Sequence, residues 1–265
     1  MGIISQLTLP EINQADNQDR LELRVTKDVS YENAHEVIDA VAASLENKPK
    51  EMVLDLSEVE MIDSSGLRAL LQSQKLCDNA GARLKLASVS QAIARIIGMS
   101  GFAQVFGLPS VHIDTQDART LRCVTEAPTG WKIYEHQATS EASVIALLRS
   151  RIMEAAENAG ADSETLCDIQ IAVGEALANA YRHGSPNKGV DKIKLRCMTC
   201  SRAIVVEISD EGKPFNPDSL GAPDPNKMRD HGMGVFLMRQ AMDVVEFQMG
   251  CPGNKVRMIK WLHKG

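Results

Sequence analysis

Apolar and polar residues follow a strand-then-helix pattern along the first hundred residues of the chain. Strict alternation is typical of a half-buried strand, and apolar residues three and four positions apart are typical of a helix packed on one face. Strands are predicted at 21–26, 52–56 and 83–86, and helices at 34–45, at 64–80 ended by Gly81, and after the capping residue Ser90. Strands separated by helices predict an α/β domain, with a mixed sheet covered by helices.

The pattern breaks around residues 125–130, and the second half has a different order. The elements predicted there are a strand at 131–138, helices near 141–159 and 162–182, a hairpin at 190–200 and 202–209, a helix at 233–243, and strands at 244–249 and 255–262. Helices grouped before an antiparallel sheet favour an α+β sandwich. We therefore expect two domains, at residues 1–122 and 131–265.

Composition narrows the possible functions. The chain has 265 residues and 44% hydrophobic content, enough for two cores, and a net charge of −6 that argues against a nucleic-acid binder. No apolar run approaches the length of about 18 residues that a membrane span needs, and no signal peptide is evident. A cytoplasmic protein that binds neither nucleic acid nor membrane is expected. Its six cysteines are expected to be reduced structural thiols.

The predicted helix at 162–182 carries polar residues at a spacing that suits metal binding. Glu175 and Asn179 are four residues apart, so they project side by side from one face. A carboxylate beside an amide oxygen suits a hard cation such as Mg²⁺, which also holds phosphates. The alternative is that these residues, with Asp168 on the same face, simply form the solvated side of an amphipathic helix.

Two glycine-containing segments further along favour a nucleotide. Asp210 and Gly212 follow the strand at 202–209, where a carboxylate can accept a hydrogen bond from an exocyclic amine such as that of adenine. The stretch from there to His231 holds four of the ten prolines, which predicts a mobile loop or lid. Gly232 and Gly234 then begin a helix, where backbone N–H groups and the helix dipole favour phosphate.

With these three motifs in this order, residues from about 131 to 263 resemble the anti-sigma factor serine kinases of the GHKL ATPase superfamily. The matching stretches are 175–184 (EALANAYRHG), 210–215 (DEGKPF) and 232–239 (GMGVFLMR). The resemblance implies a Bergerat-type ATP pocket, with Asn179 on Mg²⁺ and Asp210 on adenine. It also implies that Glu175 is the base that accepts the proton of a protein serine. The family often has Thr where this chain has Asn254.

Residues from about 3 to 118 resemble the anti-sigma factor antagonist (STAS) family. The stretches that carry this resemblance are 53–57 (VLDLS), 61–67 (MIDSSGL), 81–86 (GARLKL) and 97–102 (IGMSGF). In that family the serine directly after the Asp is phosphorylated by such a kinase, which points to Ser64. The alternative, that the hydroxyls cap a helix, stays open for Ser65. Ser30 stands where the family has an acidic residue, and Asp28 is the possible substitute.

The resemblances together imply an ATP- and Mg²⁺-dependent protein-serine kinase fused to its antagonist-type substrate, acting as a phosphorylation-controlled partner switch. Expected partners are a sigma factor, or another antagonist or kinase of such a system, and a second copy of the chain in a homodimer. One alternative is a non-catalytic nucleotide-binding module that sequesters a partner, which the presence of both Glu175 and Asn179 disfavours. A two-component histidine kinase is disfavoured because no helix pair with an exposed histidine is predicted before residue 131.

Overall fold

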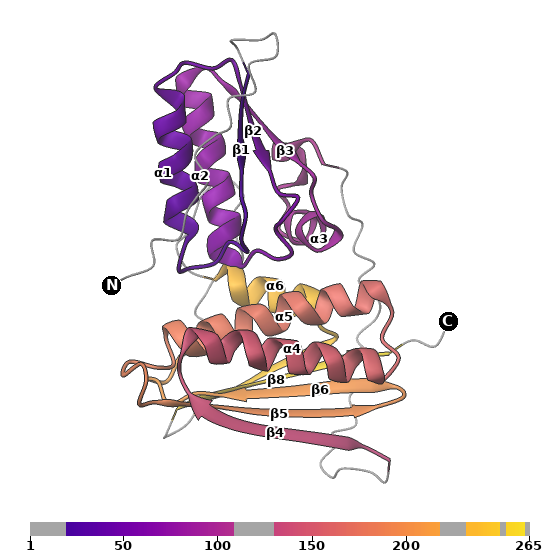
Figure 1. Ribbon diagram of the computed structural model, residues 1–265. Helices are drawn as coiled ribbons and strands as arrows, with labels where there is room; N and C mark the ends of the chain where they lie inside the picture. The colour runs from indigo at the N-terminus through magenta and orange to yellow at the C-terminus, as the bar shows by residue number, and fades with distance from the viewer. Residues whose placement is uncertain (1–19, 109–129, 218–231, 250–252, 263–265) are drawn as a thin grey trace. The chain divides into compact units, whose positions relative to one another are not determined.

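The structure is a computed structural model that describes residues 20–108, 130–217, 232–249 and 253–262 (Figure 1). The chain divides into two compact units between Val111 and His112, and each unit is described by itself. This division falls outside the described residues, as does most of the segment between the predicted domains. The boundaries at residues 122 and 131 therefore stay predictions.

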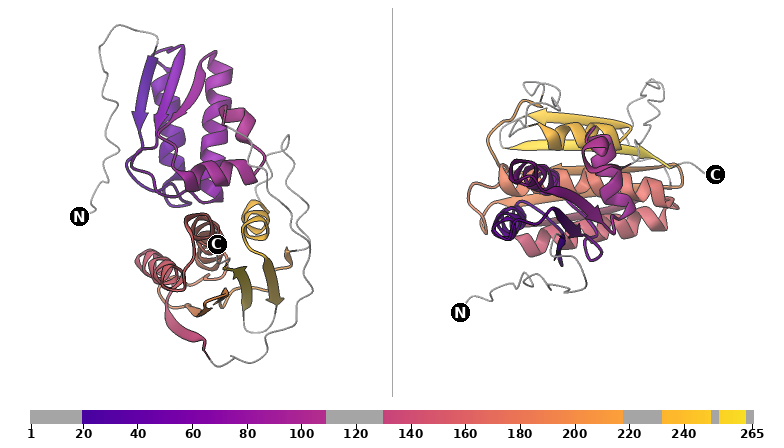
Figure 2. Two further views of the ribbon diagram at one scale, coloured as in Figure 1. Left: turned by 90° about the vertical axis from the view of Figure 1, so that its right-hand side faces the viewer. Right: turned by 90° about the horizontal axis from the view of Figure 1, so that it is seen from above.

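The first unit is built on a parallel sheet in the order β1-β2-β3. Its elements are β1 (Arg20–Arg24), α1 (Ala34–Leu45), β2 (Glu51–Asp55), α2 (Ser64–Ala80), β3 (Arg83–Ala87), α3 (Gln91–Met99) and the short 3-10 helix η1 (Ala103–Phe106). Figures 1 and 2 show α1 and α2 side by side, and α3 on the opposite side of the strands. The α/β class is confirmed. The described strands pair only in parallel, so a mixed sheet would need a strand from outside the described ranges.

The first turn of α2 is capped by Asp63. One carboxylate oxygen, Oδ1, accepts hydrogen bonds from the backbone N–H groups of Ser65 and Gly66, at 2.7 and 2.9 Å. The alternative that Ser65 caps this helix is therefore wrong, because Asp63 is the N-cap and its carboxylate accepts the N–H groups of Ser65 and Gly66. Gly66 is required by packing, since a Cβ there would overlap the carbonyl oxygen of Val29.

The second unit is a five-stranded antiparallel sheet in the order β4-β5-β6-β8-β7, with three helices on one face (Figures 1 and 2). The elements are β4 (Lys132–Thr139), α4 (Ala142–Asn158), α5 (Ser163–Arg182), β5 (Lys192–Cys200), β6 (Ala203–Ser209), α6 (Met233–Ala241), β7 (Val244–Met249) and β8 (Asn254–Trp261). The α+β sandwich is confirmed. The apolar stripes of the helices form its core with the inward-facing strand residues.

Within the described ranges, no helix is both long and apolar enough to cross a bilayer. The four described cysteines form no disulfide with one another: Cys77, Cys167, Cys197 and Cys200. Cys123 and Cys251 lie outside the described residues.

We expect Asp63→Ala to loosen the start of α2. The change removes the cap and also the acceptor of the Tyr31 N–H, which donates to Asp63 Oδ2 at 3.1 Å. Losing an N-cap costs roughly 1–2 kcal/mol, or about 5–30-fold in the opening equilibrium. Peptide-resolved hydrogen exchange measures this directly. Tryptophan fluorescence does not, because both tryptophans, Trp131 and Trp261, lie in the second unit.

The matched control is Ser90→Ala, which removes the single 3.3 Å cap bond of α3. It should speed exchange in α3 and leave α2 unchanged. Wild-type exchange at the start of α2 in Asp63→Ala would contradict the assignment of the cap.

Candidate functional site

Helix α5 carries two of the predicted site residues one turn apart. Glu175 exposes only 2% of its surface, and Asn179, one turn later, is half-buried. Asp168, two turns before Glu175, exposes 3%. The alternative of a solvated face is therefore wrong for both acidic residues, which are enclosed by the structure.

The start of α6 meets α5 at Glu175. A Cβ added at Gly234 would overlap Oε2 of Glu175 and would lie 3.6 Å from Nδ2 of Asn179. Gly232, the N-cap of α6, has a left-handed backbone with φ 108°, which only glycine adopts readily. The structure thus brings the predicted Gly-x-Gly segment directly against the predicted Glu-x-x-x-Asn pair. The predicted lid at 214–231 lies outside the described residues from position 218 onward.

Asp210 follows β6 and is fixed in place by its neighbours. Its Oδ1 accepts hydrogen bonds from the Gly212 N–H at 2.9 Å and from the side-chain amide of Asn254 at 3.0 Å. A Cβ at Gly184, just after α5, would overlap the Asp210 carboxyl group. The turn that carries Asp210 and Gly212 is therefore pressed against the end of the same helix that carries Glu175 and Asn179.

Three further residues contribute to this site but were not among the predicted site residues: Gly184, Gly253 and Asn254. A Cβ at Gly253, which has φ +86°, would overlap the carbonyl oxygen of Asp210. Asn254, at the position where Thr is frequent in the family, links the start of β8 to the turn at residues 210–215. Its amide donates to Asp210 and to the carbonyl of Lys213, and its Oδ1 accepts from the Phe215 N–H at 2.9 Å. In the sequence, the feature that points to Asn254 is that it stands where the family often has Thr.

Ser64, the predicted acceptor, lies in the first unit as the first residue of α2 and exposes 6% of its surface. The loop before it is supported by Asp28, whose Oδ1 accepts the N–H groups of Glu60 and Met61 at 3.0 and 2.8 Å. Asp28, rather than Ser30, thus supplies a carboxylate to this loop. Ser64 and the residues around Glu175 belong to different units.

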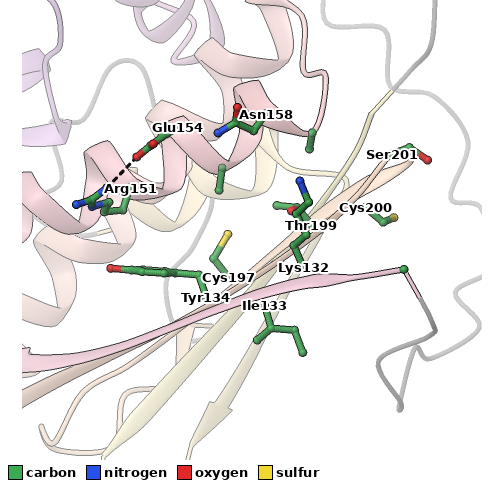
Figure 3. Close-up of a pocket in the computed structure, with 13 residues that line it drawn as sticks. Lys132, Ile133, Tyr134, Arg151, Glu154, Asn158, Cys197, Thr199, Cys200 and Ser201 are labelled. Carbon is green, nitrogen blue, oxygen red and sulfur yellow. Dashed lines mark hydrogen bonds and ion pairs between the residues drawn. The ribbon is translucent and has the colours of Figure 1, made fainter.

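A separate pocket of about 450 Å³ lies between α4 and the strands β4 and β5. Figure 3 shows Arg151, Glu154 and Asn158 of α4 on one side, with Tyr134 and Cys197 on the other. None of the predicted site residues lines it. Burial raises the pKa of the Cys197 thiol to about 12, so it stays protonated near neutral pH and is a poor nucleophile.

No group of three or more His, Cys, Asp or Glu side chains is placed to hold a metal ion in the described part of the chain. A metal at the α5–α6 site would therefore take most of its ligands from elsewhere, as Mg²⁺ does when it is held by one or two protein oxygens and the phosphates of a substrate.

Comparisons with known proteins identify the families of the two halves of the chain. The family description "Histidine kinase-like ATPase domain" matches residues 138–260, and "STAS domain" matches residues 10–118. The serine-protein kinase RsbW of Staphylococcus epidermidis is 30% identical over 139 residues, which are 49% of this chain and 87% of that protein. RsbW of Bacillus velezensis is 26% identical over 137 residues, 49% of this chain and 85% of that protein.

Among solved structures, the RsbU and RsbW domains of Rv1364c from Mycobacterium tuberculosis match with a TM-score of 0.38 and 14% identity. That match covers 51% of this chain and 33% of the solved chain. The histidine kinase-like ATPase description covers the residues among which Glu175, Asn179, Asp210 and Gly234 lie. The chain therefore belongs to the RsbW family of serine-protein kinases, with a histidine kinase-like ATPase domain in its second half and a STAS domain in its first.

Proposed function

We propose that the chain binds Mg-ATP between α5, the Asp210 turn and the start of α6, and transfers the γ-phosphate to Ser64 of a STAS domain. The observation that carries this proposal is the close approach of Gly234 to Glu175 and Asn179. It places backbone N–H groups, a carboxylate and an amide around one point. These are the groups that phosphoryl transfer needs for positioning, for charge neutralisation and for proton removal.

The adenine end of the site is assigned to Asp210. Its Oδ1 is engaged by Gly212 and Asn254, and a Cβ at Gly184 would lie 2.6 Å from its Oδ2. Because Gly184 has no side chain, the Asp210 carboxyl group can lie directly against the end of α5. Oδ1 is engaged by the protein, so Oδ2 is the oxygen assigned to accept a hydrogen bond from the exocyclic amine of adenine.

The phosphate end is assigned to the start of α6. N–H groups at a helix start lack intrahelical partners and favour anions, and glycines at 232 and 234 let phosphate oxygens come close. The side-chain oxygen of Asn179 is suited to Mg²⁺, with phosphate oxygens as further ligands. When bound, Mg²⁺ neutralises part of the phosphate charge, and Asn179 orients it.

Glu175 is assigned the proton transfer. Its carboxylate accepts the hydroxyl proton of the acceptor serine as the serine oxygen bonds to the γ-phosphorus and the bond to the ADP oxygen breaks. The enclosure of Glu175 shields this step from bulk water. A non-catalytic nucleotide-binding module has no use for such a base, so a variant of Glu175 separates the two functions.

Ser64 is assigned as the acceptor, and its hydroxyl must be uncovered when the STAS domain meets the kinase site, since it exposes 6% of its surface. Phosphorylation adds roughly −1.5 to −2 charges beside Asp63, whose Oδ1 already takes two N–H groups of the helix start. Repulsion between the two anions would weaken a contact made through this surface. That is the switch by which a sigma factor or another antagonist would exchange places with the STAS domain.

Transfer is proposed to take place between the two chains of a homodimer. Fusion holds kinase and acceptor at an effective concentration of roughly millimolar, which disfavours competition by a free antagonist. A linker of about a dozen residues spans at most about 40 Å, and this short reach favours presentation of Ser64 to the site of the neighbouring chain.

Asp210→Asn should weaken ATP binding about 10- to 100-fold, because a hydrogen bond to a charged group contributes roughly 1.5–3 kcal/mol. Titration calorimetry of the full chain measures this affinity. Asp243→Asn is the control, since Asp243 is exposed after α6 and accepts the Trp261 N–H. Equal ATP affinity in the Asp210 variant and in wild type would remove Asp210 from the site.

Glu175→Gln should bind ATP as wild type does and lose about 10²–10⁴-fold in the rate of phosphoryl transfer, the usual contribution of a positioned base. Single-turnover assays with Mg-ATP measure the rate. Glu164→Gln, an exposed change in the first turn of the same helix, should transfer normally. Wild-type transfer by Glu175→Gln would rule out the base assignment.

Ser64→Ala should abolish phosphate incorporation, whereas its neighbour control Ser65→Ala should retain it. Mass spectrometry after incubation with Mg-ATP locates the phosphate. Mixing a Glu175→Gln chain with a Ser64→Ala chain then tests transfer between chains. We expect phosphate on Ser64 of the first chain. Its absence, with both proteins folded and exchanging partners, would exclude transfer between chains, and a phosphate on Ser65 would exclude Ser64.

A further inference from the structure

A largely buried ion pair lies inside the second unit. The ammonium of Lys260 on β8 donates to Oδ2 of Asp168 on α5 and to the carbonyl oxygen of Ala241, both at 2.7 Å. The side chain of Lys260 exposes 15% of its surface and that of Asp168 4%. Charged groups are rarely buried to this degree without a specific partner, and here each charge has one.

The position of this pair relates it to the proposed nucleotide site. Ala241 is the last residue of α6, and Gly234, which abuts Glu175, lies in its first turn. Glu175 follows Asp168 by seven positions on α5, as Ala241 follows Gly234 on α6. On each helix the two residues are about two turns apart. The later residue of α5 meets the earlier residue of α6, so the two helices run antiparallel and meet at two points. One point is Gly234 against Glu175, and the other is Ala241 joined to Asp168 through Lys260.

The bond to Ala241 suits the end of a helix. Carbonyl groups in the last turn lack intrahelical partners, and the helix dipole is negative there, so a lysine ammonium is a favourable donor. Asp168 in turn neutralises the ammonium in its enclosed position. The three groups therefore tie the last turn of α6, the first half of α5 and the last strand together.

We propose that Lys260 is a positioning residue for phosphoryl transfer. By fixing the end of α6 to Asp168, it sets where the N–H groups at the start of α6 stand relative to Glu175 and Asn179. The inference rests on the proposed Mg-ATP site, to which it adds a residue that touches neither nucleotide nor acceptor. Because α6 has only nine residues, a shift at its end tilts its beginning. A misplacement of about 1 Å at reacting groups can cost roughly 10²-fold in rate.

The test separates positioning from mere stabilisation. Lys260→Met alone leaves Asp168 buried without its partner, and such a variant can fail to fold. The double variant Asp168→Leu/Lys260→Met removes both charges at similar volume, a change that buried pairs often tolerate, and still removes the bond to Ala241. Lys260→Arg retains a cation for both acceptors. Lys194→Met, on an exposed position of β5, is the matched control.

Full-length variants are compared by calorimetry with ATP and with adenosine, by thermal melting, and by single-turnover transfer. We expect the double variant to melt near wild type and to bind adenosine normally. Its affinity for ATP should fall about tenfold, the worth of one charge-assisted hydrogen bond, and its transfer rate by roughly 10²-fold. Lys260→Arg should retain most of the ATP affinity and most of the transfer rate. Lys194→Met should have the wild-type ATP affinity and transfer rate.

A folded double variant with the wild-type ratio of ATP to adenosine affinity and the wild-type rate would overturn the inference alone. The inference would also be overturned if the double variant melted at a lower temperature and lost affinity for adenosine and for ATP by the same factor. The ion pair would then only stabilise the fold. A wild-type chain that does not prefer ATP to adenosine would overturn the nucleotide site, and the inference with it.

Discussion

The second unit depends on how closely α6 approaches α5 where Gly234 meets Glu175. At that point the separation of the two helices is limited by backbone atoms on one side and a carboxylate on the other, because any Cβ at Gly234 would overlap Oε2. The amides at the start of α6, the carboxylate of Glu175 and the amide of Asn179 therefore form one group. Glu175 is enclosed at the place where the two helices meet.

The same kind of constraint shapes the other end of the site. Gly184 and Gly253 each allow close contact with Asp210, and Gly212 leaves room for the carbonyl of His183, where a Cβ would lie at 2.7 Å. Segments from the end of α5, the turn after β6 and the start of β8 thus converge on one carboxylate. Asn254 completes the arrangement, because its side chain supplies donors and an acceptor that the crowded backbone groups need.

Much of this architecture could be predicted from local pattern. The stripe of α5, the alternation of the strands and the Gly81 end of α2 are each decided by residues a few positions apart, and these elements lie close to where the pattern places them. Interactions between distant residues could not be predicted in this way. Asn254 contacts Asp210 across 44 positions and Lys260 contacts Asp168 across 92. Asp168 looked like a surface residue because the cation that allows its burial belongs to another element. Local pattern also left open whether Asp63 or Ser65 caps α2. Asp63 is the cap because its carboxylate accepts two N–H groups of the first turn.

The presence of a STAS domain and an RsbW-type domain in one polypeptide has a consequence for how the system is tuned. Two separately made components have a ratio that gene dosage, promoter strength or proteolysis can change, and that ratio sets the threshold of a switch. Here translation itself fixes the stoichiometry at one to one. Raising expression adds acceptor and catalyst equally and leaves their balance where it was. Under the proposed function, an input that shifts the balance must therefore act on something other than synthesis, such as the ratio of ATP to ADP or the rate at which a phosphatase removes phosphate from the acceptor.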